Sequence, residues 1–181
     1  MAGAWRHGEY RDPVPSLTRN RLTAADQSRL ALRSGDRVLV VATLADGRRA
    51  AASRLALHVV SDDAVVRAPW ADVDRGNLDP ASRTLTVRWV WGTSEALVFE
   101  SDRASVRFTQ TFRERVQQSV VHATSVTVPG GGARVALRRD EDGALFTQVL
   151  ADEGVDLADP LVAAAVDAAE DAIRAAAGLP G

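Results

Sequence analysis

Short apolar runs separated by turn residues fill the region from residue 37 to residue 100. Apolar and polar side chains alternate within the longest run, where Leu85, Val87, Trp89 and Trp91 share one face, and this is the period of a half-buried strand. Asp46-Gly47 favours a hairpin between the first two runs. The pattern predicts seven strands, at residues 37–44, 48–53, 54–60, 64–68, 72–79, 83–91 and 95–100.

The hydrophobic period lengthens to about four residues after residue 100. Ser101 is the expected N-cap of a helix over residues 102–123 that packs against the strands. The apolar stripe of this helix consists of Ala104, Phe108, Phe112, Val116 and Val120. A shorter helix is predicted upstream, over residues 24–34, with Thr23 as its N-cap and Gly35 as its end.

A second, smaller unit follows the long helix. Strands are predicted at residues 124–128, 134–139 and 144–150, joined by a glycine-rich turn and an acidic turn. Asp159-Pro160 then opens a helix that runs to Ala177. The apolar side of this helix consists mostly of small residues, which permits close approach to another element or to a second copy of the chain.

Three parts are predicted along the chain. Residues 1–22 lack periodicity and are expected to form a flexible arm, in which Trp5 is a large aromatic residue that needs a docking place. Residues 23–122 form a β-rich domain closed by its helix. Residues 123–181 form a strand-strand-strand-helix extension.

Four short motifs characterise residues 23–122 in addition to the order of strands and helices. They are Gly35-Asp36-Arg37-Val38-Leu39, Asp46-Gly47, Ser53-Arg54-Leu55-Ala56-Leu57 and Pro69-Trp70-Ala71-Asp72-Val73. Together with seven strands and one helix, they resemble the bacterial branch of the pleckstrin-homology-like (PH-like) family over residues about 23–122. The third-strand motif departs from the family, because Ala52-Ser53 stands where Thr-Asp is usual. The resemblance implies an α+β fold, a seven-stranded antiparallel PH-like barrel closed by a C-terminal helix and followed here by a small strand-and-helix extension.

A barrel of this kind is a scaffold, so its fold does not determine which ligand it binds. Relatives that hold phosphoinositides gather basic side chains around the first hairpin, where several cations surround a phosphate. This chain offers Arg48 and Arg49 beside the hairpin, followed by Ala50–Ala52. Because adjacent strand residues point to opposite faces, binding of an anionic lipid through this hairpin is an alternative function and not the leading one.

Composition narrows the chemistry. The chain of 181 residues has no cysteine, which excludes a disulfide framework, a thiolate zinc site and a cysteine nucleophile. All 22 basic residues are arginine, a bias typical of a GC-rich bacterial genome such as that of an actinobacterium. The sequence has neither a secretory signal nor an apolar run of about 20 residues, so a cytoplasmic location is expected.

Charge is distributed unevenly along the chain. Residues 1–139 carry 21 arginines against 14 acidic residues, a net charge of +7, whereas residues 140–181 carry one arginine against 10 acidic residues, a net charge of −9. Such asymmetry indicates either an acidic segment that folds onto a basic body, within the chain or across a dimer, or a solvated helix face.

Motifs of an active site or a metal site are missing from the sequence. The histidines are expected to stay apart, in an arm, a strand and a helix end: His7, His58 and His122. The acidic residues from Asp72 to Asp79 do not match a calcium loop and are expected in turns. Gly130–Gly132 lacks the Lys-Ser/Thr of a phosphate loop and is expected to connect a hairpin. We therefore predict no enzyme activity, no catalytic residue and no cofactor.

Trp89 and Trp91, beside Arg88, have the side chains of a base-stacking platform. An isoelectric point near 5.9 opposes binding to nucleic acid, and at least one of the two indoles is expected in the core. The leading hypothesis is a non-enzymatic interaction or scaffold module that binds a protein partner or forms a homodimer. Candidate contacts are Arg48, Arg49, Trp5 and Trp91. The alternatives are the binder of an anionic membrane surface and an enzyme with no recognisable motif.

Overall fold

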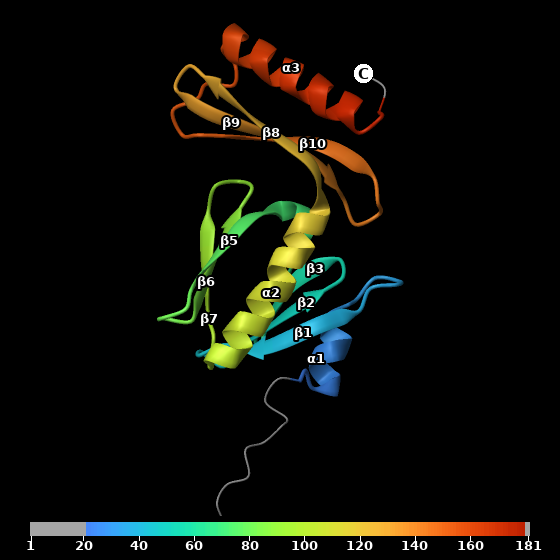
Figure 1. Cartoon of the computed structure of the whole chain (residues 1–181). Helices are drawn as coiled ribbons and strands as arrows, with labels where there is room; N and C mark the ends of the chain where they lie inside the picture. Colours follow the sequence, from blue (N-terminus) through green and yellow to red (C-terminus); the bar gives the residue numbers. More distant parts are fainter. Residues whose placement is uncertain (1–20, 180–181) are drawn as a thin grey trace, which may run out of the picture.

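The computed structural model describes residues 21–179, which form an α+β fold with three antiparallel sheets (Figure 1). The strand orders are β1-β2-β3-β4, β5-β6-β7 and β10-β9-β8. The strands are β1 (Val38–Thr43), β2 (Arg49–Ser53), β3 (Ala56–Val60), β4 (Val65–Pro69), β5 (Val73–Asp79), β6 (Thr84–Trp89), β7 (Ser94–Val98), β8 (Val120–Val128), β9 (Gly131–Arg139) and β10 (Leu145–Ala151). The helices are α1 (Ala24–Arg29), the 3-10 turn η1 (Trp70–Asp72), α2 (Asp102–Ser119) and α3 (Pro160–Ala176).

All seven strands predicted for the first part are present, but they form two sheets and no closed barrel. Between β4 and β5 the chain passes through η1, and the two strands do not pair. On the other side, the ends of β1 and β7 meet at an isolated bridge between Leu44 and Phe99. The expected closed barrel is therefore corrected to a four-stranded and a three-stranded sheet, because continuous pairing is missing at both joins.

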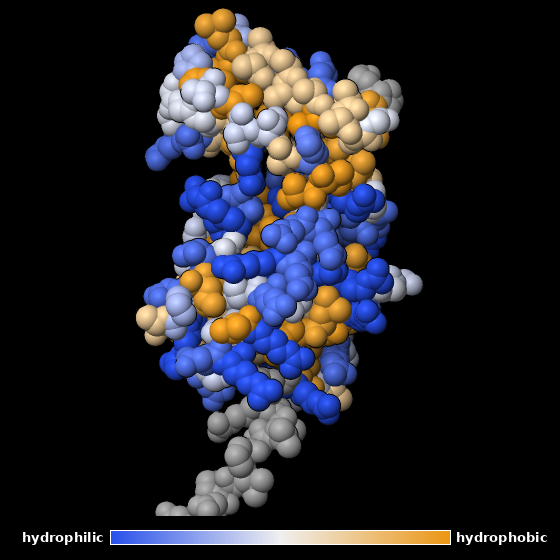
Figure 2. Space-filling model, viewed as in Figure 1, coloured by the Kyte–Doolittle hydropathy of each residue, from blue (hydrophilic) through white to orange (hydrophobic). Residues whose placement is uncertain are grey.

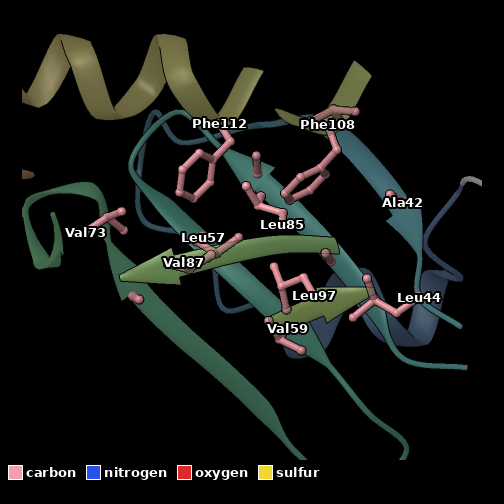
Figure 3. Packing of buried hydrophobic residues seen from close by; sticks show 14 of the residues in the cluster. Ala42, Leu44, Leu57, Val59, Val73, Leu85, Val87, Leu97, Phe108 and Phe112 are labelled. Atoms are coloured by element: carbon pink, nitrogen blue, oxygen red, sulfur yellow. The ribbon is translucent and has the colours of Figure 1, made fainter. Parts of the chain in front are cut away.

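Helix α2 covers the apolar space between these two sheets (Figure 3). Figure 3 shows the rings of Phe108 and Phe112 pointing from the helix toward Leu57 and Leu85. Both phenylalanines are buried, which confirms the apolar stripe predicted from the sequence. Strand β5 approaches the helix closely because it has Gly76, where a Cβ atom would lie 2.4 Å from Cε1 of Phe112.

Both helices of the first part end earlier than predicted. Helix α1 stops at Arg29, and the following Leu30 is buried. Helix α2 stops at Ser119, because Val120 already pairs with Arg138 of β9. Strand β8 consequently begins inside the segment predicted as helix, a change that depends on a partner strand further along the chain.

The third sheet and α3 form a layered unit stacked on one end of the first part (Figure 1). Strands β8 and β9 form a hairpin through Gly130, as expected from its sequence, and Asp159 caps α3 by accepting a 2.7 Å hydrogen bond from the Leu161 N–H. The small apolar side of α3 packs on this sheet and buries Val162, Val166, Ala169 and Ile173. The side expected to permit close approach is thus covered within the chain.

Candidate functional site

The first part and the C-terminal unit meet around Arg138, whose side chain is fully buried. One terminal nitrogen, Nη1, donates 2.9 Å hydrogen bonds to the carbonyl oxygen of Ala71 and to Oε1 of Gln148. The other, Nη2, donates 2.9 Å hydrogen bonds to the carbonyl oxygen of Val73 and to Oγ of Ser119. A single side chain of β9 therefore fastens the C-terminal sheet to η1, to the start of β5 and to the end of α2.

Neutral acceptors surround this buried charge. Burial lowers the pKa of Arg138, the neighbouring Arg134 lowers it further, and the carboxylates of Asp74 and Asp72 act in the opposite direction. A guanidinium nevertheless stays protonated in proteins. Removing it would take a charged donor from the buried carbonyl oxygens of Ala71 and Val73, so Arg138 acts as the structural centre of the junction.

A second contact across the junction involves Asp74 of β5. Its side chain is only 8% exposed and forms ion pairs with Arg134 of β9 and, at 3.7 Å, with Arg75. Partial burial strengthens such pairs relative to pairs on an open surface. Asp74 lies in β5, within the strand predicted over residues 72–79, and contacts the C-terminal unit through Arg134.

The acidic turn between β9 and β10 folds onto the basic first part. Glu141 pairs with Arg67 of β4 and lies 3.6 Å from Arg33, and Asp142 accepts a 2.6 Å hydrogen bond from Arg33. Of the two interpretations of the charge asymmetry, this turn follows the first, an acidic segment docked within the chain.

A cleft of about 510 Å³ lies between the β5–β7 sheet and the C-terminal sheet. Figure 2 shows the surface hollowed at this level, between the two stacked parts. One wall comes from β5, β6 and the turn after β6, and the other from the third sheet. Its charged and aromatic lining consists of Asp74, Arg75, Arg88, Trp89, Trp91, Arg134 and Asp152.

Two tryptophans make the aromatic part of the cleft. The rings of Trp89 and Trp91 stack with their centroids 5.4 Å apart and their planes within 9°. Trp89 is 8% exposed and belongs to the core, as predicted for at least one of the pair. Trp91 is 59% exposed, and its Nε1 donates a 2.7 Å hydrogen bond to Oγ1 of Thr93. Core packing and this hydrogen bond therefore hold an exposed indole in a fixed orientation.

Both carboxylates of the cleft have hydrogen-bond or ion-pair partners, whereas one of its arginines has no acidic partner in the described residues. Asp74 already pairs with two arginines, and Asp152 accepts a 2.8 Å hydrogen bond from the Gly132 N–H. Arg88 is exposed, and none of the acidic residues within 21–179 pairs with it. The same cleft therefore offers a guanidinium and an exposed indole, two groups suited to carboxylate and aromatic ligands.

The two arginines predicted at the first hairpin contact carboxylates of their own chain. Arg48 donates a 2.7 Å hydrogen bond to Asp46 and lies 3.6 Å from Glu95, while Arg49 pairs with Asp26 of α1. The hollow beside them also contains Asp62 and Asp63, so carboxylates outnumber arginines in its lining.

The remaining candidate residues do not form a site. Trp5 and His7 lie outside the described residues, whereas His58 is buried in β3 and His122 is exposed in β8. Oγ of Ser53 lies 3.3 Å from Nε2 of His58, and burial lowers the pKa of this histidine. Within residues 21–179, no three His, Asp or Glu side chains are grouped as metal ligands would be.

Sequence reasoning found Trp91 but missed Arg75, Arg134 and Arg138. Arg138 lies on the opposite face of β9 from Ala133, Val135 and Leu137, which face the core of the third sheet. Nothing in the local sequence indicates that the other unit covers this face.

Comparison with models of protein families, with curated proteins and with solved structures finds no match to this chain. In the described part of the chain, no helix is long and apolar enough to cross a membrane. The arguments about function therefore depend on the geometry of the chain itself.

Proposed function

We propose that this protein is a non-enzymatic interaction module that holds an acidic segment of a partner protein in the cleft between the β5–β7 sheet and the C-terminal sheet. The observation that carries the proposal is that one cleft is lined both by the exposed indole of Trp91 and by Arg88, whose guanidinium has no carboxylate partner within residues 21–179. Tryptophan and arginine contribute disproportionately to binding energy at protein interfaces. A guanidinium also binds carboxylates in a planar, bidentate geometry.

The first part is proposed to be an open, divergent PH-like domain. Support comes from the succession of seven antiparallel strands, divided into sheets of four and three, followed directly by the covering helix α2. The C-terminal unit supplies the second wall of the cleft, so the binding surface belongs to neither part alone.

The lipid alternative has less physical support. Arg48 and Arg49 are already paired with Asp46 and Asp26, and the adjacent Asp62 and Asp63 would repel a phosphate. An anionic headgroup would have to displace these carboxylates and overcome the repulsion of the others.

Peptide selection tests the proposal. Random twelve-residue peptides displayed on phage would be selected against the full chain and depleted on the double variant Arg88→Gln/Trp91→Ala. We expect the retained peptides to be enriched in Asp and Glu. A synthetic version should bind at least tenfold more weakly to each single variant, because each loses a contact to the peptide.

The matched control is Arg103→Gln, which neutralises an exposed arginine on α2 outside the cleft. It should bind the selected peptide as well as the unchanged protein does. A selection that retains no peptide after depletion on the double variant, or retained peptides with no acidic preference, would contradict the proposed cleft.

A further inference from the structure

A separate pocket of about 170 Å³ lies where α2, η1 and the β9–β10 turn meet. Its lining includes Arg54, Trp70, Arg115, Gln118, Ser119 and Arg139. The pocket lies at the opposite end of β2 from Arg48 and Arg49, since Arg54 follows the last residue of that strand. It also shares no lining residue with the cleft of Trp91 and Arg88.

Three guanidinium groups from distant parts of the sequence converge on this pocket. Arg115 and Arg139 have no ion-pair partner within residues 21–179, and Arg54 donates a 3.2 Å hydrogen bond to the carbonyl oxygen of Gly35. Nε of Arg115 is buried and has no hydrogen-bond partner in the described residues. Because Arg115 and Arg139 line the pocket without forming an ion pair with a described residue, the site retains capacity for an anion.

The two carboxylates in the lining already have partners. Oδ1 of Asp140 accepts hydrogen bonds of 2.9 Å and 2.8 Å from the backbone N–H groups of Asp142 and Ala144. Glu141 is held by Arg67 and Arg33. These contacts leave the positive charge of the pocket in excess over its free negative charge.

We propose that this pocket binds a phosphate group. Arginines offer paired N–H donors that match two phosphate oxygens, and the side-chain amide of Gln118 offers a further donor. The volume exceeds the space that one water needs, but it is too small to enclose a peptide segment. Residues of both the first part and the C-terminal unit line the pocket, so a bound phosphate would stabilise the junction that also forms the cleft.

Titration of the full chain with inorganic phosphate at constant ionic strength, followed by two-dimensional NMR, tests this proposal. We expect saturable shifts of the Trp70 indole N–H and the Gln118 side-chain amide. Arg115→Gln and Arg139→Gln should each weaken binding about tenfold or more, because each removes a charge-assisted hydrogen bond. Arg139 is exposed, so its variant tests the site without disturbing the core.

Arg103→Gln is again the matched control, and its affinity for phosphate should be unchanged. The proposal is wrong if the shifts do not saturate, or if Arg115→Gln and Arg139→Gln both bind phosphate as tightly as the unchanged protein. A second arm uses vesicles containing phosphatidic acid. Vesicle binding that phosphate competes away and Arg139→Gln abolishes assigns the phosphate group to a lipid headgroup. Saturable binding of phosphate without vesicle binding assigns it to a soluble phosphate.

Discussion

The guanidinium of Arg138 donates a 2.9 Å hydrogen bond to the carbonyl oxygen of Val73, where η1 ends and β5 begins. Val73 is a fully buried residue of the first core, whereas Arg138 belongs to the sheet of the C-terminal unit. The two parts have separate hydrophobic cores and are joined by a buried polar contact. Because the cleft and the phosphate pocket both lie at this junction, their geometry depends on it.

Replacing Arg138 by Met should destabilise the protein by about 3 kcal/mol or more, because the carbonyl groups of Ala71 and Val73 would lose their buried donor. Urea unfolding at pH 7 measures the change. Arg107→Met, on the exposed side of α2, is the control and should change stability by less than about 0.5 kcal/mol. Equal stability of the two variants would show that the junction does not need the guanidinium.

Gly76→Ala should destabilise the protein by about 1–3 kcal/mol, because the added Cβ would lie 2.4 Å from Cε1 of Phe112. Without this contact, alanine would be the better residue in a strand. The same substitution should therefore cost less in a Phe112→Leu background, and a double-mutant cycle from urea unfolding measures the difference. A neutral or stabilising Gly76→Ala would contradict the close packing of β5 against α2.

Trp89→Ala and Trp91→Ala should separate stability from binding. Trp89 is a core residue, so its truncation should cost about 3–5 kcal/mol. Trp91 is 59% exposed, and its truncation should cost less than about 1 kcal/mol. Thermal unfolding of both variants checks the contrast. A large loss of stability in Trp91→Ala would identify Trp91 as a structural residue and weaken its proposed role in binding.

Stability should fall as the pH decreases through the titration range of His58. Burial is the main cause of its lowered pKa in the folded protein, and the neighbouring Arg67 lowers the pKa further. The unfolded chain binds a proton near pH 6.5 while the folded ring stays neutral, so acid favours unfolding. The free energy of unfolding should drop by at most about 1.4 kcal/mol per pH unit from this one group.

Urea unfolding between pH 7.5 and pH 5.5 measures this slope. His58→Leu should flatten it, because the substitution removes the group that titrates differently in the two states. His122→Gln, which changes an exposed histidine, is the comparison variant. An identical slope in all three proteins would rule out His58 as its origin.

The elements of the first part could be predicted because their causes are local. Alternation in β6, the turn at Asp46-Gly47 and the four-residue period of Phe108 and Phe112 all act over a few neighbouring residues. The end of α2 could not be predicted in the same way. Ser119 continues the helical pattern, but Val120 pairs with Arg138, a strand partner far along the chain.

The residues of the candidate site also divide into those that the local sequence indicates and those that only the fold identifies. Trp91 was identified because two tryptophans beside an arginine are unusual in any short segment. Arg88 gained its importance only when the fold placed it in a cleft, where no acidic residue of the described segment 21–179 pairs with it. Arg48 lost importance for the opposite reason, since Asp46 and Glu95 contact it. An arginine in a sequence has the same charge whether or not a carboxylate lies beside it in space.

The sequence by itself determined the order of strands and helices, the apolar faces of α2 and α3 and the acidic character of the C-terminal segment. Only the tertiary structure decided that the seven strands remain two sheets, that Arg138 is buried and that Glu141 docks on Arg67. The physical reason is the separation along the chain over which each effect acts. Side-chain periodicity and turn chemistry act between near neighbours, whereas burial and charge pairing depend on which distant segments meet.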